Sequence, residues 1–327
     1  MGVGTDISDW VAEAGLGRAT AVVPLAGGVS SDVFRVDLPS GPICVKRALD
    51  RLKVAADWRA PVERSSYEAA WLRTAAPLGG PIVPEILAED TERHLFAMTW
   101  FAPEDHPVWK SELAAGRVDP AFAAQVGRAL AVIHARTAHS PELAAAFPTD
   151  ALFTSLRIEP YLTHTARAHP DLAARIEAIA ATTLSTKTAL VHGDVSPKNI
   201  LVGPDGPVFL DAECAWYGDP AFDIAFCANH LLLKAAWKPE HRAAYAAAFD
   251  ALVQAYLAGA TWEARDALDR RAGPLLAALF LARIDGKSPV EYLTDEADKA
   301  LVRGVARELL RRDQLTLQDV AKAWADR

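Results

Sequence analysis

The residues of this chain that are best suited to chemistry lie in one short stretch. In residues 190–202, two apolar segments flank a polar loop that contains Asp194 and Asn199, five residues apart across a predicted turn. The next apolar segment ends at Asp211. Carboxylate and amide oxygens suit Mg²⁺, which usually keeps water and substrate phosphates as its other ligands. A further Asp can accept a proton from a hydroxyl, so these residues supply the base and the metal ligands that phosphoryl transfer needs.

Phosphoryl transfer also needs a positive group to hold the phosphates. Lys46 lies in a predicted strand, and Glu68, on the following predicted helix, can hold it by an ion pair. Glu63 is one turn earlier and is the rival partner, and Lys46 could instead be a surface lysine of an amphipathic strand. The sequence therefore predicts a clamp in the first hundred residues that serves the polar loop around Asp194.

The elements that position these residues change in kind near residue 100. Period-two alternation and turn residues predict strands over 21–25, 33–38, 43–46, 85–88 and 95–99, with a helix over 62–74. The later residues are Ala-rich, and apolar spacing predicts helices over 121–135, 172–181, 221–234, 241–257, 262–284 (with a kink or break near Pro274), 296–312 and 316–325. Short strands are expected over 189–191, 200–202 and 208–210. We therefore expect an α+β fold with a small antiparallel-sheet lobe (1–99), a hinge (100–107) and a larger helical lobe (108–327).

Composition sets limits on the partners. The 327 residues are 51% hydrophobic and 23% charged, with a net charge of −8 and three cysteines. Such a balance is typical of a globular protein, and it lacks the basic stripe of a nucleic-acid binder. The absence of a long apolar run or leader pattern and the lack of a CxxC pair predict a cytoplasmic protein without a membrane partner.

The motifs resemble a known family. The run from His192 to Asn199, then Asp211-Ala212-Glu213 and residues 218–223, is similar to the aminoglycoside phosphotransferase-like small-molecule kinases, which have a protein-kinase-like fold. Residues 211–218 show local similarity to methylthioribose kinases. The resemblance implies ATP and Mg²⁺ as cofactors and a small-molecule hydroxyl as acceptor.

The resemblance also implies roles for individual residues. Asp194 would be the catalytic base, and the metal ligands would be Asn199, Asp211 and Glu213. The implied nucleotide contacts are Lys46 with Glu68, the phosphate loop at Gly28, Ser30 and Ser31, and the adenine-binding hinge at Met98, Trp100 and Phe101. Protein kinases place a lysine two residues after the base, where this chain has Ser196; Lys198, four residues after Asp194, is the candidate for that contact.

The acceptor site is expected on the surface that faces Asp194. Arg283 and Asp285 form a charged group at the end of a predicted helix, where they either contact the acceptor or cap the helix. Trp58 lies in a loop that could cover the substrate or pack on the lobe surface. His192 is expected to be a packed histidine that orders the loop, and Asp219 and Asp223 are expected to satisfy N–H groups at a helix start.

The reaction predicted is transfer of the γ-phosphoryl group of ATP to a sugar-like, amino-alcohol or aminoglycoside-like hydroxyl. A non-catalytic ATP-binding protein of the same fold is one alternative, although it would be expected to lose Asp194, Asn199 or Asp211. A metal-dependent phosphoesterase is the other, and it would need neither Lys46 nor Glu68.

Overall fold

An antiparallel sheet forms the N-terminal part of the protein. The computed structural model describes residues 3–26, 30–51, 60–79 and 82–325. The sheet has the strand order β1-β2-β3-β5-β4, with β1 (Ala21–Pro24), β2 (Ser31–Leu38), β3 (Gly41–Ala48), β4 (Ile86–Asp90) and β5 (Leu95–Thr99). Every neighbouring pair is antiparallel, as the alternation of the sequence predicted.

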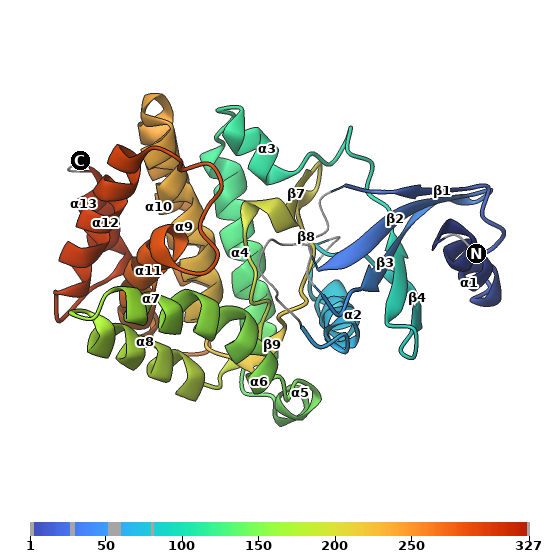
Figure 1. Cartoon of the computed structure of the whole chain (residues 1–327), viewed down its shortest axis with the longest axis horizontal. Coiled ribbons are helices and arrows are strands. Elements are labelled where there is room, and N and C mark those ends of the chain that lie inside the picture. Colours follow the sequence, from blue (N-terminus) through green and yellow to red (C-terminus); the bar gives the residue numbers. More distant parts are fainter. Residues whose placement is uncertain (1–2, 27–29, 52–59, 80–81, 326–327) are drawn as a thin grey trace.

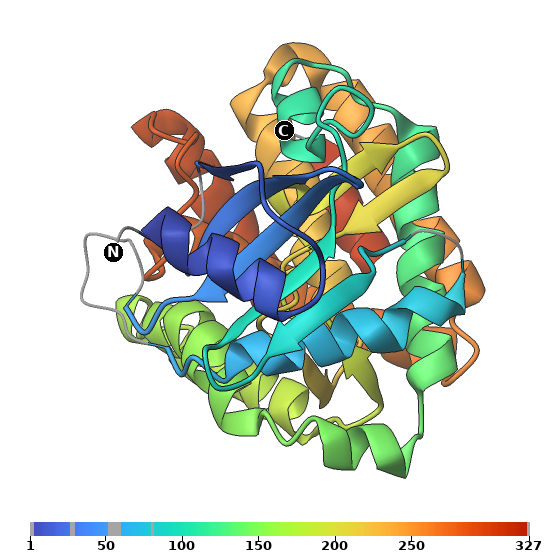
Figure 2. The same cartoon turned by 90° about the vertical axis from the view of Figure 1, so that its right-hand side faces the viewer.

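Two helices cover opposite faces of this sheet (Figures 1 and 2). Helix α1 (Val3–Glu13), which the sequence reading missed, packs Ile7, Trp10 and Val11 with the face that carries Val45. Helix α2 (Arg64–Ala75) packs on the face that carries Cys44. Because side chains alternate along a strand, Lys46 points to the same face as Cys44, toward α2. The sheet therefore aims Lys46 at the helix that bears Glu68.

The rest of the described chain is mainly helical (Figure 1). Its helices are α3 (Trp109–Ala114), α4 (Pro120–Thr137), α5 (Pro141–Ala146), α6 (Asp150–Phe153), the π-helix η2 (Thr154–Thr163), α7 (His164–Ala168), α8 (Ala173–Ser185), α9 (Ala221–Trp237), α10 (Arg242–Gly259), α11 (Arg265–Asp285), α12 (Glu296–Leu310) and α13 (Leu317–Ala325). Short 3₁₀ turns are η1 (Ala76–Leu78), η3 (Pro197–Asn199) and η4 (Pro239–His241). The α+β fold, with a sheet followed by a helical region, is confirmed. None of the helices described is long and apolar enough to cross a membrane.

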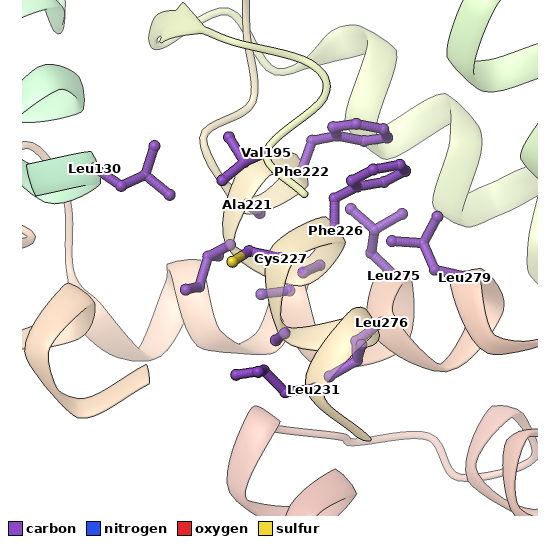
Figure 3. Packing of buried hydrophobic residues seen from close by; sticks show 14 of the residues in the cluster. Leu130, Val195, Ala221, Phe222, Phe226, Cys227, Leu231, Leu275, Leu276 and Leu279 are labelled. Atoms are coloured by element: carbon purple, nitrogen blue, oxygen red, sulfur yellow. The ribbon is translucent and has the colours of Figure 1, made fainter. Parts of the chain in front are cut away.

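Helix α9 lies at the centre of the helical core. All its residues from Ala221 to Ala236 are buried, and Figure 3 shows Phe222 and Phe226 beside Leu275 and Leu279 of α11. Pro274 does not break the predicted helix, since α11 continues from Arg265 to Asp285.

Two small ladders hold the polar loop. Strand β6 (Ala189–Val191) pairs with β9 (Trp216–Gly218), and β7 (Ile200–Gly203) pairs with β8 (Gly206–Phe209). The loop of residues 192–199 leaves β6 and enters β7, and the segment that contains Asp211 joins β8 to β9. The ladders therefore bring both segments to the same place, next to α2 and β3.

Candidate active site

Lys46 joins the sheet to the helical region through two carboxylates. Its Nζ is 2.8 and 2.7 Å from the two carboxylate oxygens of Glu68, and it also pairs with Asp211 Oδ1. Glu63 lies just before the first residue of α2 and forms no hydrogen bond with Lys46. Glu68 is therefore the partner of Lys46. Burial alone would lower the pKa of Lys46, but the charges of Asp211 and Glu68 outweigh it and raise that pKa. Lys46 is therefore a fixed positive charge between the two parts of the protein.

Asp211 has an unusual backbone conformation. Its φ is +67°, in the left-handed region that non-glycine residues seldom adopt. Such conformations cluster at functional sites, because the surrounding structure must hold them in place. Burial opposes its negative charge, yet Lys46 and Lys198 hold the pKa of Asp211 below its usual range. Asp211 is thus ionised, and Oδ2 remains available after Oδ1 binds Lys46.

The loop that carries Asp194 is held by buried hydrogen bonds. Asp223 of α9 accepts from the backbone N–H groups of His192 (2.8 Å) and Gly193 (2.9 Å). The His192 ring accepts from the Asp194 N–H at Nδ1 (3.1 Å) and donates to the Leu210 carbonyl from Nε2 (3.0 Å). Burial lowers the pKa of His192, so the ring is neutral and orders the loop. Asp223 therefore holds the Asp194 loop rather than its own helix start, whereas Asp219 accepts from the Ala221 N–H (3.0 Å) as predicted.

Gly193 is required by this geometry. Its φ is +78°, and a Cβ at this position would lie 2.5 Å from the carbonyl oxygen of Cys214. The close approach brings the loop against the segment that follows Asp211. A side chain here would push the two segments apart.

Two cations flank the Asp194 carboxylate. Arg157 Nη2 and Lys198 Nζ each lie 3.1 Å from Oδ2. Burial opposes the charge of Asp194, but Lys198 and Arg157 outweigh it and lower its pKa. Asp194 is therefore ionised and can accept a proton. Lys198 lies at the carboxylate that the sequence identified as the base.

The sequence reading missed Arg157. It comes from the π-helix η2, a rare geometry that is often found at functional sites. Its Nε donates to the Gly193 carbonyl and its Nη1 to the Leu156 carbonyl (2.8 Å). Residues 154–163 show no motif that would single out an arginine, so only the folded chain places it beside Asp194.

The residues predicted to bind Mg²⁺ each keep one oxygen for that purpose. Asn199 Nδ2 donates to the Asp194 carbonyl (3.1 Å), which leaves its amide oxygen for a cation. Glu213 Oε2 accepts from Arg64 Nε (3.0 Å), which leaves Oε1. In the part of the chain that is described, His, Cys, Asp and Glu alone form no metal cluster of three. An amide and one or two carboxylates completed by substrate phosphates are what Mg²⁺ accepts, so this donor set fits the ion.

Arg64 is the second residue that sequence reasoning missed. Its side chain is 1% exposed and binds Glu213, the carbonyls of Ala60 (3.0 Å) and Pro61 (2.8 Å), and those of Leu49 (2.7 Å) and Ser30. It thus ties Glu213 to the start of β2 and the end of β3. Its position at the first residue of α2 gave no signal, since the partners are distant in sequence.

We expect Arg64→Lys to destabilise the protein by about 1–3 kcal/mol, because one ammonium cannot replace five guanidinium bonds and buried acceptors lose their donor. Denaturant unfolding measures this loss. Arg47→Lys is the matched control, since Arg47 pairs with Asp6 on the surface of the same sheet. Equal losses for the two variants would contradict the role given to Arg64.

The structure places the remaining nucleotide candidates as follows. Ser30 and Ser31 are buried at the start of β2, and Gly28 lies outside the described residues. Met98 is in β5, opposite Cys44 and Ile86. Trp100 and Phe101 follow β5, with Trp100 against Arg35 and Phe101 against His106. The described candidates all lie in or next to the N-terminal sheet.

The acceptor candidates lie in the helical part, except Trp58, which is outside the described residues. Arg283 lies in the last turn of α11 and is 9% exposed. Asp285 is bound by Arg303 through two nitrogens (2.8–3.0 Å) and by His169 (3.0 Å). Those contacts tie α11 to α12 and α7, so Asp285 is already engaged within the fold.

The fold is shared with solved kinase structures. A putative fructosamine-3-kinase from Thermobifida fusca is similar with a TM-score of 0.59 and 22% identity, over 95% of this chain and 100% of the other. A choline/ethanolamine kinase family protein from Mesorhizobium loti gives 0.55 and 20%, over 99% of each chain. An amicoumacin kinase, solved with AMP-PNP, Ca²⁺ and its ligand, gives 0.57 and 15%, over 95% of each chain. The architecture is therefore that of the kinase-like phosphotransferases.

The sequence comparison gives the family. The model described as the phosphotransferase enzyme family matches residues 21–268, so the chain belongs to this family of phosphotransferases, and the resemblance read from the motifs is confirmed. A curated methylthioribose kinase from Pectobacterium carotovorum is 29% identical over 234 residues, which are 62% of this chain. One from Yersinia enterocolitica is 26% identical over the same share. The chain spans 57% of the length of these relatives.

Proposed function

We propose that the protein transfers the γ-phosphoryl group of ATP to a hydroxyl group of a small molecule. The observation that supports this best is the arrangement of Lys46, Glu68 and Asp211 next to the Asp194 loop, where Lys46 and Glu68 are buried and Asp211 is partly exposed. A phosphoesterase would not need a lysine held in this way. A protein that only binds nucleotide would not need an ionised carboxylate flanked by two cations.

The chain's own residues would act by position and charge. Lys46 would hold the phosphates of ATP, and Asp194 would orient the acceptor hydroxyl and take its proton as the oxygen attacks the γ-phosphorus. The bond between the γ-phosphorus and the bridging oxygen breaks, and its electron pair leaves with ADP. Lys198 and Arg157 would stabilise the charge that develops beside Asp194. Asn199, Asp211 and Glu213 would hold Mg²⁺, which when bound neutralises phosphate charge.

The experiment is measurement of ADP release from Mg-ATP in the presence of a panel of hydroxyl compounds. Release that depends on one class of acceptor supports the proposal. Release without an acceptor would indicate a phosphatase-like reaction, and Mg-ATP binding without release under any condition would indicate a binding protein.

Glu68 makes the nucleotide clamp sensitive to pH. Burial raises the pKa of Glu68 to about 7, with Asp211 adding to the effect and Lys46 opposing it. Only the carboxylate can hold Lys46 as an ion pair, so kcat/KM for ATP should rise with pH through about 7 and fall about tenfold per pH unit below it.

The same pKa shift of Glu68 affects the stability of the fold. The folded protein binds this proton more tightly than the unfolded chain, so the stability that Glu68 contributes is present below its unfolded pKa and is lost as pH rises toward 7.

Glu68→Gln tests this origin of the pH profile. The variant should be slower, and the acidic limb near pH 7 should disappear, because glutamine does not titrate. Persistence of the same limb in the variant would assign it to another group.

A further inference from the structure

Two cations in the helical region are buried without a carboxylate partner. Buried charges are normally paired, because removing an ion from water is costly. Arg283 is 9% exposed and Lys234 is 2% exposed. Among the described residues, neither forms a salt bridge, unlike Arg157 or Lys46. This departure from the usual rule indicates that the partner is a bound molecule.

Arg283 has one edge of its guanidinium occupied and the other free. Its Nη1 donates to the Tyr161 hydroxyl (3.3 Å) and to the carbonyl and hydroxyl of Ser288. Its Nε is buried and has no hydrogen-bond partner in the described structure, and Nη2 forms none there. The Nε–Nη2 edge is one that binds carboxylate or phosphate with two parallel hydrogen bonds.

Lys234 lies on α9 and is surrounded by aromatic rings. Its Nζ is 4.1 Å from the ring centre of Tyr292 and 5.2 Å from that of Trp237. Burial, together with the charge of Lys110, lowers its pKa to about 8. The nearest carboxylate that acts on it, Glu291, is paired with Lys110. Lys234 is thus a cation that the protein itself does not neutralise.

A continuous set of side chains links Asp194 to Arg283 and to His230, which lies one helical turn before Lys234 on α9. Arg157, which binds Asp194, also lies over the rings of Tyr161 and Phe226, 5.8 Å from each centre. Arg283 binds Tyr161, and the Phe226 ring contacts His230 at 5.6 Å. Figure 3 shows Phe226 of α9 and Leu279 of α11 in the same cluster. His230 follows Phe226 by four residues and Arg283 follows Leu279 by four, so each lies one helical turn further along its helix. This row of buried side chains therefore runs from Asp194 along both helices.

The charge along this row of side chains is positive. Burial, and then the charges of Arg283, Lys234, Lys198 and Lys110, lower the pKa of His230 well below its usual value, so His230 is neutral. The acidic side chains nearby are engaged, since Glu291 pairs with Lys110 and Asp285 with Arg303. An aminoglycoside-like cation would meet repulsion here, and a neutral sugar would leave both cations without a partner.

We propose that the acceptor carries an anionic group, a carboxylate or a phosphate, which Arg283 and Lys234 bind while its hydroxyl faces Asp194. This inference rests on the proposed kinase activity and narrows its substrate class. Through Ser288, Arg283 also holds the segment that follows α11. Lys234 has no such structural role, so its substitution is the more direct test of the proposal.

The first experiment compares polyhydroxy acceptors that carry a carboxylate, a phosphate, no charged group or an ammonium group. ADP release would be measured with D-gluconate, D-glucose 6-phosphate, D-glucitol and D-glucosamine, and with three- to five-carbon members of each class. Hydroxy acids or phosphorylated sugars should exceed neutral and cationic compounds by about tenfold or more in kcat/KM. The better of the two anionic classes identifies the group. Higher activity with glucitol- or glucosamine-type compounds would overturn the proposal and leave the kinase activity intact.

The second experiment removes the charge of Lys234. Lys234→Met should raise Tm in the absence of substrate by about 2 °C or more, because a buried unpaired charge is removed. It should raise KM for the anionic acceptor about 10–100-fold with KM for ATP unchanged. Arg283→Lys, which keeps the charge and loses the two-bond edge, should also raise KM for the acceptor. Lys322→Met, at an exposed lysine of α13, is the control and should change neither value.

Measurement of Tm, which needs no turnover, separates this inference from the kinase proposal. The anions of the panel should raise Tm of the wild type, and this increase should be lost in Lys234→Met. Anion-dependent stabilisation without ADP release would support the anion site and contradict the kinase activity. If no anion stabilises the wild type, or if Lys234→Met lowers Tm and leaves KM unchanged, Lys234 is a packing residue and the proposal fails.

Discussion

Asp194→Asn is expected to lower kcat by about 10²–10⁴-fold, the usual contribution of a positioned base. Asparagine keeps the shape of the side chain and cannot accept the acceptor's proton. The Asp194 N–H would still donate to His192, and Asp223 would still hold the loop, so the fold around the site should persist. Affinity for Mg-ATP should stay nearly unchanged because Lys46 and Asp211 are intact. Steady-state kinetics and calorimetry measure the two effects separately.

Asp205→Asn is the matched control for this variant. Asp205 lies exposed in the turn between β7 and β8, the hairpin that follows the catalytic loop. It should retain full activity. If Asp194→Asn keeps more than half of the wild-type rate, the base is a different residue.

Asp211→Asn is expected to lower kcat/KM for ATP by about 10²–10³-fold, the range for loss of one pre-organised electrostatic group. Asparagine tolerates the left-handed backbone at φ +67° better than alanine does, so this variant removes charge with little added strain. The carboxylate that pairs with Lys46 is lost, and so is a predicted Mg²⁺ ligand. The Mg²⁺ concentration needed for half-maximal rate should therefore rise.

Titration of activity with Mg²⁺ at fixed ATP checks this expectation. Glu213→Gln provides the comparison, because Glu213 is also a predicted ligand but is tied to Arg64. A larger effect in Glu213→Gln than in Asp211→Asn would make Glu213 the main ligand.

Local patterns of apolar residues were enough to predict many of the strands and helices. The alternation of apolar residues predicted all five strands of the first sheet, and helical spacing predicted α9 and α12. The five-residue spacing of Asp194 and Asn199 predicted that the two side chains lie close together, because a short turn limits how far apart they can be. Helix α1 was missed, although its buried residues Ile7, Trp10 and Val11 have the i, i+3, i+4 spacing of an amphipathic helix.

Long-range contacts could not be read from the chain. Arg157 reaches Asp194 across 37 positions, and Arg64 reaches Glu213 across 149. Asp223 was assigned to its own helix start, where its carboxylate had an obvious local use. Its actual partners, the N–H groups of His192 and Gly193, follow β6 directly and are brought to Asp223 by tertiary packing.

The position of α9 has an evolutionary consequence. One end of this helix holds the Asp194 loop through Asp223, and the other end carries His230 and Lys234, which lie ~10 Å and ~16 Å further along the axis at 1.5 Å per residue. If the proposed anion site is correct, substitutions in the last two turns would alter which acceptor is recognised without disturbing the hydrogen bonds that shape the loop. A lineage with this helix would then change its substrate through a few buried residues near one end of α9 while the phosphate chemistry stayed constant.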